Sequence, residues 1–219
     1  KPQTFKDAAL QSRFFTRNAL HLSVAAGIRS DSIARWLGTE RVVRAMPNTP
    51  SLIGKGMTAL FPRPAVTSDD QRLVARVMAT TGEHLWVAQE NQLDAVTALS
   101  GSGPAYVFYF IEAMTQAGAE MGLSLEQAKR LAVATFIGAG ELAHESNEPP
   151  EILRQRVTSK GGTTYAAITS MEQDDIKGRR DPLRPFANRA LQRIHRNIVR
   201  HQEPFEADSL ADDLLGHDA

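Results

Sequence analysis

The 219-residue sequence has no cysteine, no long hydrophobic run and no excess of one charge. Without cysteine there can be no disulfide, thiolate metal ligand or cysteine nucleophile, and this composition fits a cytoplasmic protein. Lysine plus arginine number 25, as do aspartate plus glutamate, so the formal net charge is +0 and we expect no nucleic-acid partner. No apolar run reaches the roughly 18 residues of a membrane span, so we expect no membrane association.

The six histidines are not spaced as metal ligands. No two of them lie four positions apart, and the motif H-E-x-x-H is absent. We therefore expect no metal site.

The first ninety residues alternate between strand and helix patterns. A short helix begins at Ser30 or Asp31 and ends before Gly38, whose missing side chain suits a helix C-terminus. Further strands and one further helix are predicted from apolar periodicity and turn residues, with strands over 20–26, 41–46, 54–61 and 84–87 and the helix over 68–80. This alternation is typical of an α/β sheet.

The second half has almost no strand signal. Residues 104–143 predict two helices that divide at Gly122, where Ser124 and Gln127 have the spacing of a capping box. Both helices are apolar nearly all round. Their apolar surface is larger than the roughly 115 residues of the second half of the chain can cover. We infer that a partner subunit covers it.

Three further segments follow these helices. A short helix up to about Val157 is predicted first, then a glycine-rich turn over 159–164 that leads into another helix. A basic helix is predicted over 182–200. The tail over 203–219 has no lysine or arginine, so we expect it to be mobile and solvated.

Two glycine-containing segments look like known functional motifs, but their positions or residues do not fit those motifs. Residues 138–143 read G-x-G-x-x-A, but they lie inside a predicted helix, whereas a dinucleotide fingerprint needs a strand before it. Residues 100–104 do not form a hydrolase elbow, because position 100 is serine. They predict a turn into a helix that begins at Pro104.

The turn at Gly161-Gly162-Thr163-Thr164 is a candidate anion site. Glycines let backbone N–H groups approach an anion, and the following helix adds its positive dipole. A plain glycine turn with a threonine cap explains the same residues equally well.

Three motifs together resemble pyrroline-5-carboxylate reductases. They are RAMPNTP over 44–50, DAVTALSGSGPAY over 94–106 and SKGGTT over 159–164, and they occur in that family's order and spacing. The resemblance covers about residues 1–200. It implies a Rossmann-type α/β domain, of which only the later part is present, followed by an all-α helical dimerisation domain. The implied boundaries are 1–92 for the NAD(P)-binding part, 93–202 for the dimerisation and substrate-binding domain, and 203–219 for the acidic tail.

The resemblance also implies a reaction, namely hydride transfer from NADPH or NADH to the C=N carbon of 1-pyrroline-5-carboxylate, which gives L-proline in a homodimer or higher homo-oligomer. Thr164 is then the catalytic residue, with its hydroxyl at the ring nitrogen. The implied substrate-binding residues are Glu90, Ser102, Gly103, Gly162, Thr163 and Thr164. The implied cofactor-binding residues are Lys1, Pro2, Val24, Ala25, Ala26, Pro47, Asn48 and Thr49.

In the family, Lys-Pro-Gln ends a strand midway through the Rossmann domain, so about two βα units and the phosphate-binding turn are expected to be absent before Lys1. Two alternatives therefore stay open. Beside the reductase function that the resemblance implies, the chain could be a catalytically inactive truncated dimerisation module or a related imine reductase. The preference for NAD or NADP stays undecided.

Overall fold

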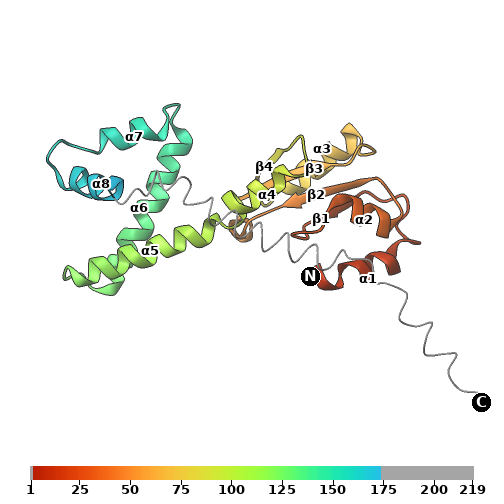
Figure 1. The fold of residues 1–219 in the computed structure, drawn as a ribbon, viewed down its shortest axis with the longest axis horizontal. Coiled ribbons are helices and arrows are strands. Elements are labelled where there is room, and N and C mark those ends of the chain that lie inside the picture. Colours follow the sequence, from red (N-terminus) through yellow and green to blue (C-terminus); the bar gives the residue numbers. More distant parts are fainter. Residues whose placement is uncertain (1, 174–219) are drawn as a thin grey trace, which may run out of the picture.

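The structure is a computed structural model that describes residues 2–173, so Lys1, the predicted basic helix over 182–200 and the predicted acidic tail over 203–219 lie outside the described residues. The described chain has an α/β part and a helical part that extends away from it (Figure 1). The predicted fold class is confirmed, since a mostly parallel small sheet with helices precedes an all-helical region.

The sheet has four strands in the order β1-β2-β3-β4. Their bounds are β1 His21–Ser23, β2 Val42–Met46, β3 Gly56–Pro62 and β4 Gly82–Trp86. The pair β1–β2 is parallel, β2–β3 is antiparallel and β3–β4 is parallel. The carboxyl ends of β1 and β2 therefore lie next to each other at one edge of the sheet.

Helices cover both faces of this sheet. Helices α1 (Pro2–Ser12) and α2 (Ser30–Leu37) form one apolar cluster with Val42 of β2, whereas α3 (Ser68–Ala79) packs with Val43 of β2 on the other face. Successive strand residues point to opposite faces, so Val42 and Val43 reach different cores.

Local signals set several of the helix ends. Gly38 ends α2 with φ 71, which only glycine adopts without strain. Helix α3 begins at Ser68, as predicted, and is capped by Thr67, because the Thr67 hydroxyl and the Asp70 carboxylate form a reciprocal capping box.

Four elements were not predicted. Helix α1 begins where the resemblance placed the end of a strand. A 3₁₀ helix, η1 (Thr49–Ile53), follows β2, and helix α4 (Gln92–Val96) continues directly into a π-helical turn, η2 (Thr97–Gly101). Each is too short or too polar to show a clear hydrophobic period.

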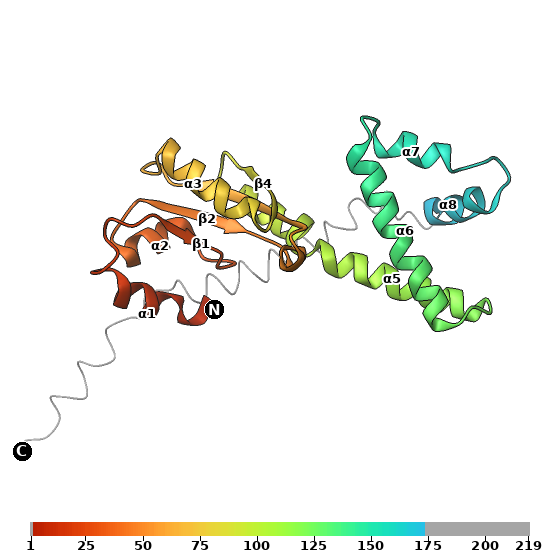
Figure 2. The same ribbon diagram turned by 180° about the vertical axis from the view of Figure 1, so that it is seen from behind.

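The helical part begins with an antiparallel hairpin. Its helices are α5 (Gly103–Glu120) and α6 (Leu125–Glu145), followed by α7 (Pro150–Arg156) and α8 (Thr163–Gln173). The predicted capping box of Ser124 and Gln127 begins α6. Gly118 lets the two helices approach, since a Cβ there would lie 2.9 Å from the Cβ of Ala128. The view from behind shows α7 and α8 at the end of the described chain farthest from the sheet (Figure 2).

The hairpin leaves much apolar surface exposed within one chain. The exposed side chains include Phe108 (58%), Tyr109 (71%), Leu131 (57%) and Ile137 (57%). Gly138 of the G-x-G-x-x-A string lies inside α6, as predicted, and a Cβ there would have no neighbour within 4 Å. No helix within residues 2–173 is long and apolar enough to cross a membrane.

Candidate active site

The two internal loops expected to bind cofactor lie side by side. Residues Val24–Ala26 follow β1 and residues Pro47–Thr49 follow β2, and these neighbouring strands run in the same direction. Ligands of open α/β sheets bind at the carboxyl ends of such strands. Val24 is 59% exposed, so this edge is open to a ligand. Pro2, the other expected residue within the described chain, begins α1.

Asn48 connects the β2 loop to two other segments. Its side-chain Oδ1 accepts a hydrogen bond from the N–H of Met57 at 2.9 Å, and its Nδ2 donates to the carbonyl of Ser100 at 3.2 Å. The loop is thus tied to the start of β3 and to η2.

Ser102 and Gly103 stand where η2 becomes α5. The N–H of Ser102 donates to the carbonyl of Thr97 at 2.8 Å, which closes the wider π-helical turn. The predicted turn before Pro104 is therefore helical. A Cβ at Gly103 would meet nothing within 4 Å, so this corner of the backbone is open.

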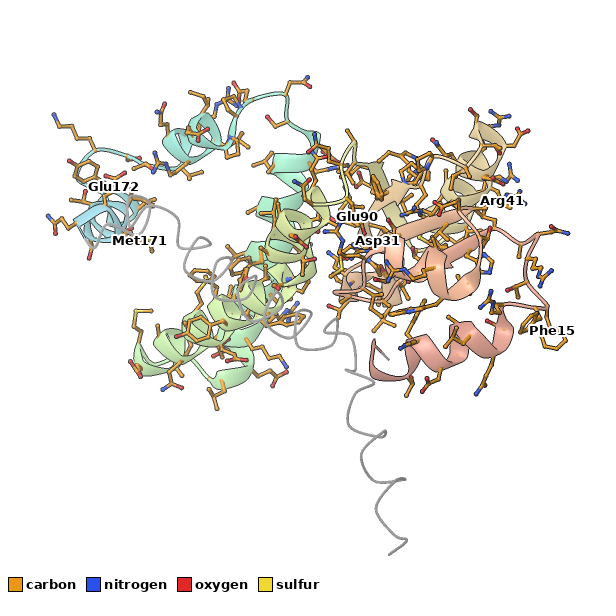
Figure 3. The ribbon with its side chains drawn as sticks, turned by 45° about the vertical axis from the view of Figure 1, so that its right-hand side comes forward. Phe15, Asp31, Arg41, Glu90, Met171 and Glu172 are labelled. Atoms are coloured by element: carbon orange, nitrogen blue, oxygen red, sulfur yellow. The ribbon has the colours of Figure 1, made fainter. Side chains whose placement is uncertain are left out.

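The Glu90 carboxylate is held by groups from α2 and β2. Its Oε1 accepts hydrogen bonds from the Ser30 N–H and from Nη1 of Arg44, both at 2.6 Å, and its Oε2 accepts from the Ser30 hydroxyl at 2.7 Å. Figure 3 shows Glu90 where the α/β part meets the helical part. Arg63 also donates to the Ser30 hydroxyl, at 3.1 Å, and pairs with Glu40.

These contacts determine the charge of Glu90. Burial of the carboxyl opposes its ionisation, but the hydrogen bonds from Ser30 and Arg44 outweigh that cost and lower the pKa of Glu90 below its ordinary value. The carboxylate is therefore ionised at neutral pH and balances the Arg44 guanidinium, whose side chain is only 10% exposed. Helix α2 begins at Ser30, so the negative charge also lies at a helix N-terminus.

The glycine-rich turn precedes α8, as predicted. Gly161 has φ 76, and the N–H of Gly162 donates to the carbonyl of Ser159 at 3.0 Å. The first helical bond runs from Ala166 to the Gly162 carbonyl, so the N–H groups of Thr163 and Thr164 precede the helical ladder. Both threonines are exposed.

The structure brings some of these residues together and separates others. The loops after β1 and β2 and the η2–α5 junction gather at one edge of the sheet. Helix α8 lies at the far end of the helical part, where Figure 3 labels Met171 and Glu172, away from Glu90. One chain therefore does not bring Thr164 to the expected cofactor loops. Within residues 2–173, no three acidic or histidine side chains gather as metal ligands.

Sequence reasoning missed the two partners of Glu90. The sequence indicated Ser30 only as a possible start of a helix and Arg44 only as part of a motif. The one available signal is that Arg44 lies two positions from Val42, which places its side chain on the face that α2 covers. Nothing local connects either residue to Glu90, which follows 60 and 46 positions later.

The sequence and the fold are similar to those of known proteins. A family model described as pyrroline-5-carboxylate reductase dimerisation matches residues 90–183. A solved structure of a pyrroline-5-carboxylate reductase from Coxiella burnetii is 36% identical, covers 91% of this chain and 72% of its own, and superposes with a TM-score of 0.79. The chain belongs to the pyrroline-5-carboxylate reductase family.

Two further members of this reductase family match over much of the chain. The pyrroline-5-carboxylate reductase of Pseudomonas aeruginosa is 47% identical over 159 residues, which are 72% of this chain. A Plasmodium falciparum pyrroline carboxylate reductase solved with NADP bound is 29% identical, covers 88% of this chain and 75% of its own, and gives a TM-score of 0.80. The matched region spans 58% of the length of the Pseudomonas relative.

Proposed function

We propose that the protein carrying this chain reduces 1-pyrroline-5-carboxylate to L-proline with NADPH or NADH, the last step of proline biosynthesis. The observation that carries the proposal is the turn before α8. It presents the N–H groups of Thr163 and Thr164 and the hydroxyl of Thr164 together, which suits a small molecule with one carboxylate and one ring nitrogen.

The proposal assigns residues 1–92 to the later part of an NAD(P)-binding Rossmann domain and residues 93–202 to a helical dimerisation and substrate-binding domain. The acidic tail over 203–219 belongs to neither. Support comes from the exposed apolar surface of α5 and α6, which a second copy would cover. The proposed assembly is a homodimer or a larger homo-oligomer in the cytoplasm.

The second copy also completes the proposed site. Hydride transfer requires the reacting atoms within about 3.5 Å of each other. In one chain, the turn before α8 lies at the far end of the helical part, whereas the loop over 47–49 contacts η2, where the helical part begins (Figure 1). We therefore assign the turn from one copy and the sheet edge from another to each site.

The substrate side uses backbone donors and one hydroxyl. The N–H groups of Thr163 and Thr164 bind the substrate carboxylate, and Gly162 shapes the turn while its own N–H is used internally. The Thr164 hydroxyl contacts the ring nitrogen and orients the C=N bond. Ser102 and Gly103 border the site, together with Glu90, whose ionised carboxylate is bound to Arg44.

The cofactor side is an open sheet edge that fits an extended dinucleotide. Val24, Ala25 and Ala26 lie beside Pro47, Asn48 and Thr49 because β1 and β2 are parallel neighbours. We assign both loops to the cofactor, together with Lys1 and Pro2. When bound, the nicotinamide supplies the hydride. The residues of this chain orient the two reactants and exclude water.

Thr164→Ala tests the proposal in the protein expressed at its natural length. We expect kcat/KM for 1-pyrroline-5-carboxylate to fall by about 10²–10³-fold, because the hydrogen bond to the ring nitrogen is lost. Thr164→Ser keeps the hydroxyl and stays within about tenfold of the parent. Ser170→Ala, which removes an exposed hydroxyl from the same helix, leaves the rate unchanged. Near-normal turnover of Thr164→Ala would remove Thr164 from this role.

A second candidate is a dimerisation module without catalytic activity. The observation that favours it is the position of the G-x-G-x-x-A string inside α6, which leaves the described residues without a phosphate-binding turn at a strand–helix junction. Titration of the 219-residue chain with NADPH and with NADH decides between the two. A dissociation constant in the range of about 1–100 μM would exclude the module, whereas no binding to the chain or to the natural-length protein would support it.

A further inference from the structure

The segment over 90–100 is bound at one end to β2 and at the other end to the loop that follows β2. At the start, Arg44 donates to the Glu90 carboxylate at 2.6 Å, and at the end, Asn48 Nδ2 donates to the Ser100 carbonyl at 3.2 Å. Between them, the buried side chains of Leu93 (1% exposed) and Ala98 (7% exposed) anchor the segment in the core.

The Asn48 end of this connection joins the two halves of the proposed site. Pro47 and Thr49 are assigned to the cofactor, whereas Ser102 and Gly103 border the substrate. The Asn48 amide spans the gap with its oxygen on the Met57 N–H and its nitrogen on the Ser100 carbonyl. Two hydrogen bonds of this kind fix both the position and the rotation of the amide.

A second contact brings the same two segments together. Gly101 lies against Met46, since a Cβ at Gly101 would come within 2.8 Å of the Met46 Cε. The absence of a side chain at Gly101 thus leaves room for the end of the Met46 side chain between β2 and η2.

We infer that Asn48 is a positioning residue: its side-chain amide sets the loop that faces the nicotinamide at a fixed distance from the η2–α5 junction that borders the substrate. Its backbone is part of the loop assigned to the cofactor, while its side chain acts through Ser100 and Met57. The inference rests on the proposed function, because the distance matters only if a hydride crosses between the two segments.

Two substitutions separate the two hydrogen bonds. Asn48→Asp keeps an oxygen for the Met57 N–H but places a second oxygen against the Ser100 carbonyl, which repels it. Asn48→Ala removes both bonds. The matched controls are Asn91→Asp and Asn91→Ala, because Asn91 is an exposed asparagine of the same segment without a side-chain cap hydrogen bond.

The assay measures kcat, the KM for each reactant and the primary isotope effect with cofactor deuterated at the transferred position, all in the natural-length protein. Displacing reactants by about 1 Å costs roughly 10²-fold in rate. We expect kcat to fall about 10–100-fold in both Asn48 variants, with the isotope effect increased and the KM for the cofactor within about threefold. A purely structural role would lower the Tm and leave the kcat of the folded fraction unchanged.

Hydrogen exchange gives a readout that does not depend on activity. We expect the Met57 amide to exchange faster in Asn48→Ala, and the amides over 97–103 to exchange faster in both Asn48 variants, with no change in the Asn91 variants. If the parent protein is active and the kcat of Asn48→Asp stays within twofold of the parent value, the inference is overturned. A parent protein without imine reductase activity overturns the proposed function instead. Unchanged hydrogen exchange over 97–103 in Asn48→Ala would also overturn the inference, because it would show that the Asn48 amide does not hold the η2–α5 junction in place.

Discussion

Replacing Glu90 by glutamine tests the charged group that connects the α/β part to the helical part. The carboxylate accepts three hydrogen bonds, of which the bond from Arg44 is charge-assisted. In Glu90→Gln, the amide keeps one acceptor oxygen, presents N–H donors where the carboxylate accepted, and leaves the Arg44 charge without its partner.

The expected loss follows from burial. Removing one partner of a fully buried ion pair costs about 3–5 kcal/mol. The two side chains are 10% and 16% exposed, so water screens the remaining charge in part, and we expect a loss of about 2–4 kcal/mol. For a chain of this size, such a loss lowers the Tm by roughly 5–15 °C.

The loss also depends on pH. The pKa of Glu90 is lower in the folded protein than its ordinary value. Such a carboxyl contributes stability above its unfolded pKa, about 4.3, and this contribution is lost as the pH falls through the folded value. The stability difference between parent and variant should therefore be complete at pH 7 and shrink in acid.

Denaturant unfolding followed by tryptophan fluorescence measures this difference. The two tryptophans, Trp36 and Trp86, lie in α2 and β4, close in sequence to Ser30 and Glu90. Glu83→Gln is the control, because it removes an exposed carboxylate from β4 and should change stability by less than about 0.5 kcal/mol. A Glu90→Gln variant as stable as the parent at pH 7, or a difference that does not change down to about pH 3, would refute the reasoning.

Two glycine substitutions give further predictions. Gly82→Ala should destabilise the fold by about 2–4 kcal/mol in denaturant unfolding, because Gly82 has φ 136 and a Cβ there would overlap the Gly56 carbonyl of the neighbouring strand; a variant with parental stability would contradict this. Gly161→Ala should raise the KM for 1-pyrroline-5-carboxylate about tenfold or more without changing that for NADPH, because φ 76 strains an alanine in the turn before α8; equal changes in both KM values would place the turn outside the substrate site.

Much of the fold could be predicted from the sequence because its signals are local. Gly38 and the capping box of Ser124 and Gln127 act within a few residues of one another, and both were predicted at the correct positions. The apolar excess of α5 and α6 was also predicted, and many of their large apolar side chains remain exposed within the described chain.

The features that the sequence did not predict are of two kinds. Some are helices without a clear apolar period, and others are contacts between residues far apart in the sequence. Helix α1 packs on α2 through Phe5 and Ala9, and its other large apolar side chain, Leu10, is exposed, so its apolar residues show no clear period. The pairing of Arg44 with Glu90 joins residues 46 positions apart, and only the folded sheet brings them together. The separation of Thr164 from the loop after β2 likewise becomes visible only in three dimensions.

The most direct measurement follows the hydride itself. The natural-length protein is incubated with 1-pyrroline-5-carboxylate and NADPH or NADH deuterated at the transferred position of nicotinamide C4, and the product is analysed by mass spectrometry. The proposed function predicts L-proline that carries one deuterium on the former C=N carbon. The absence of proline with either cofactor, or proline without deuterium, would contradict it.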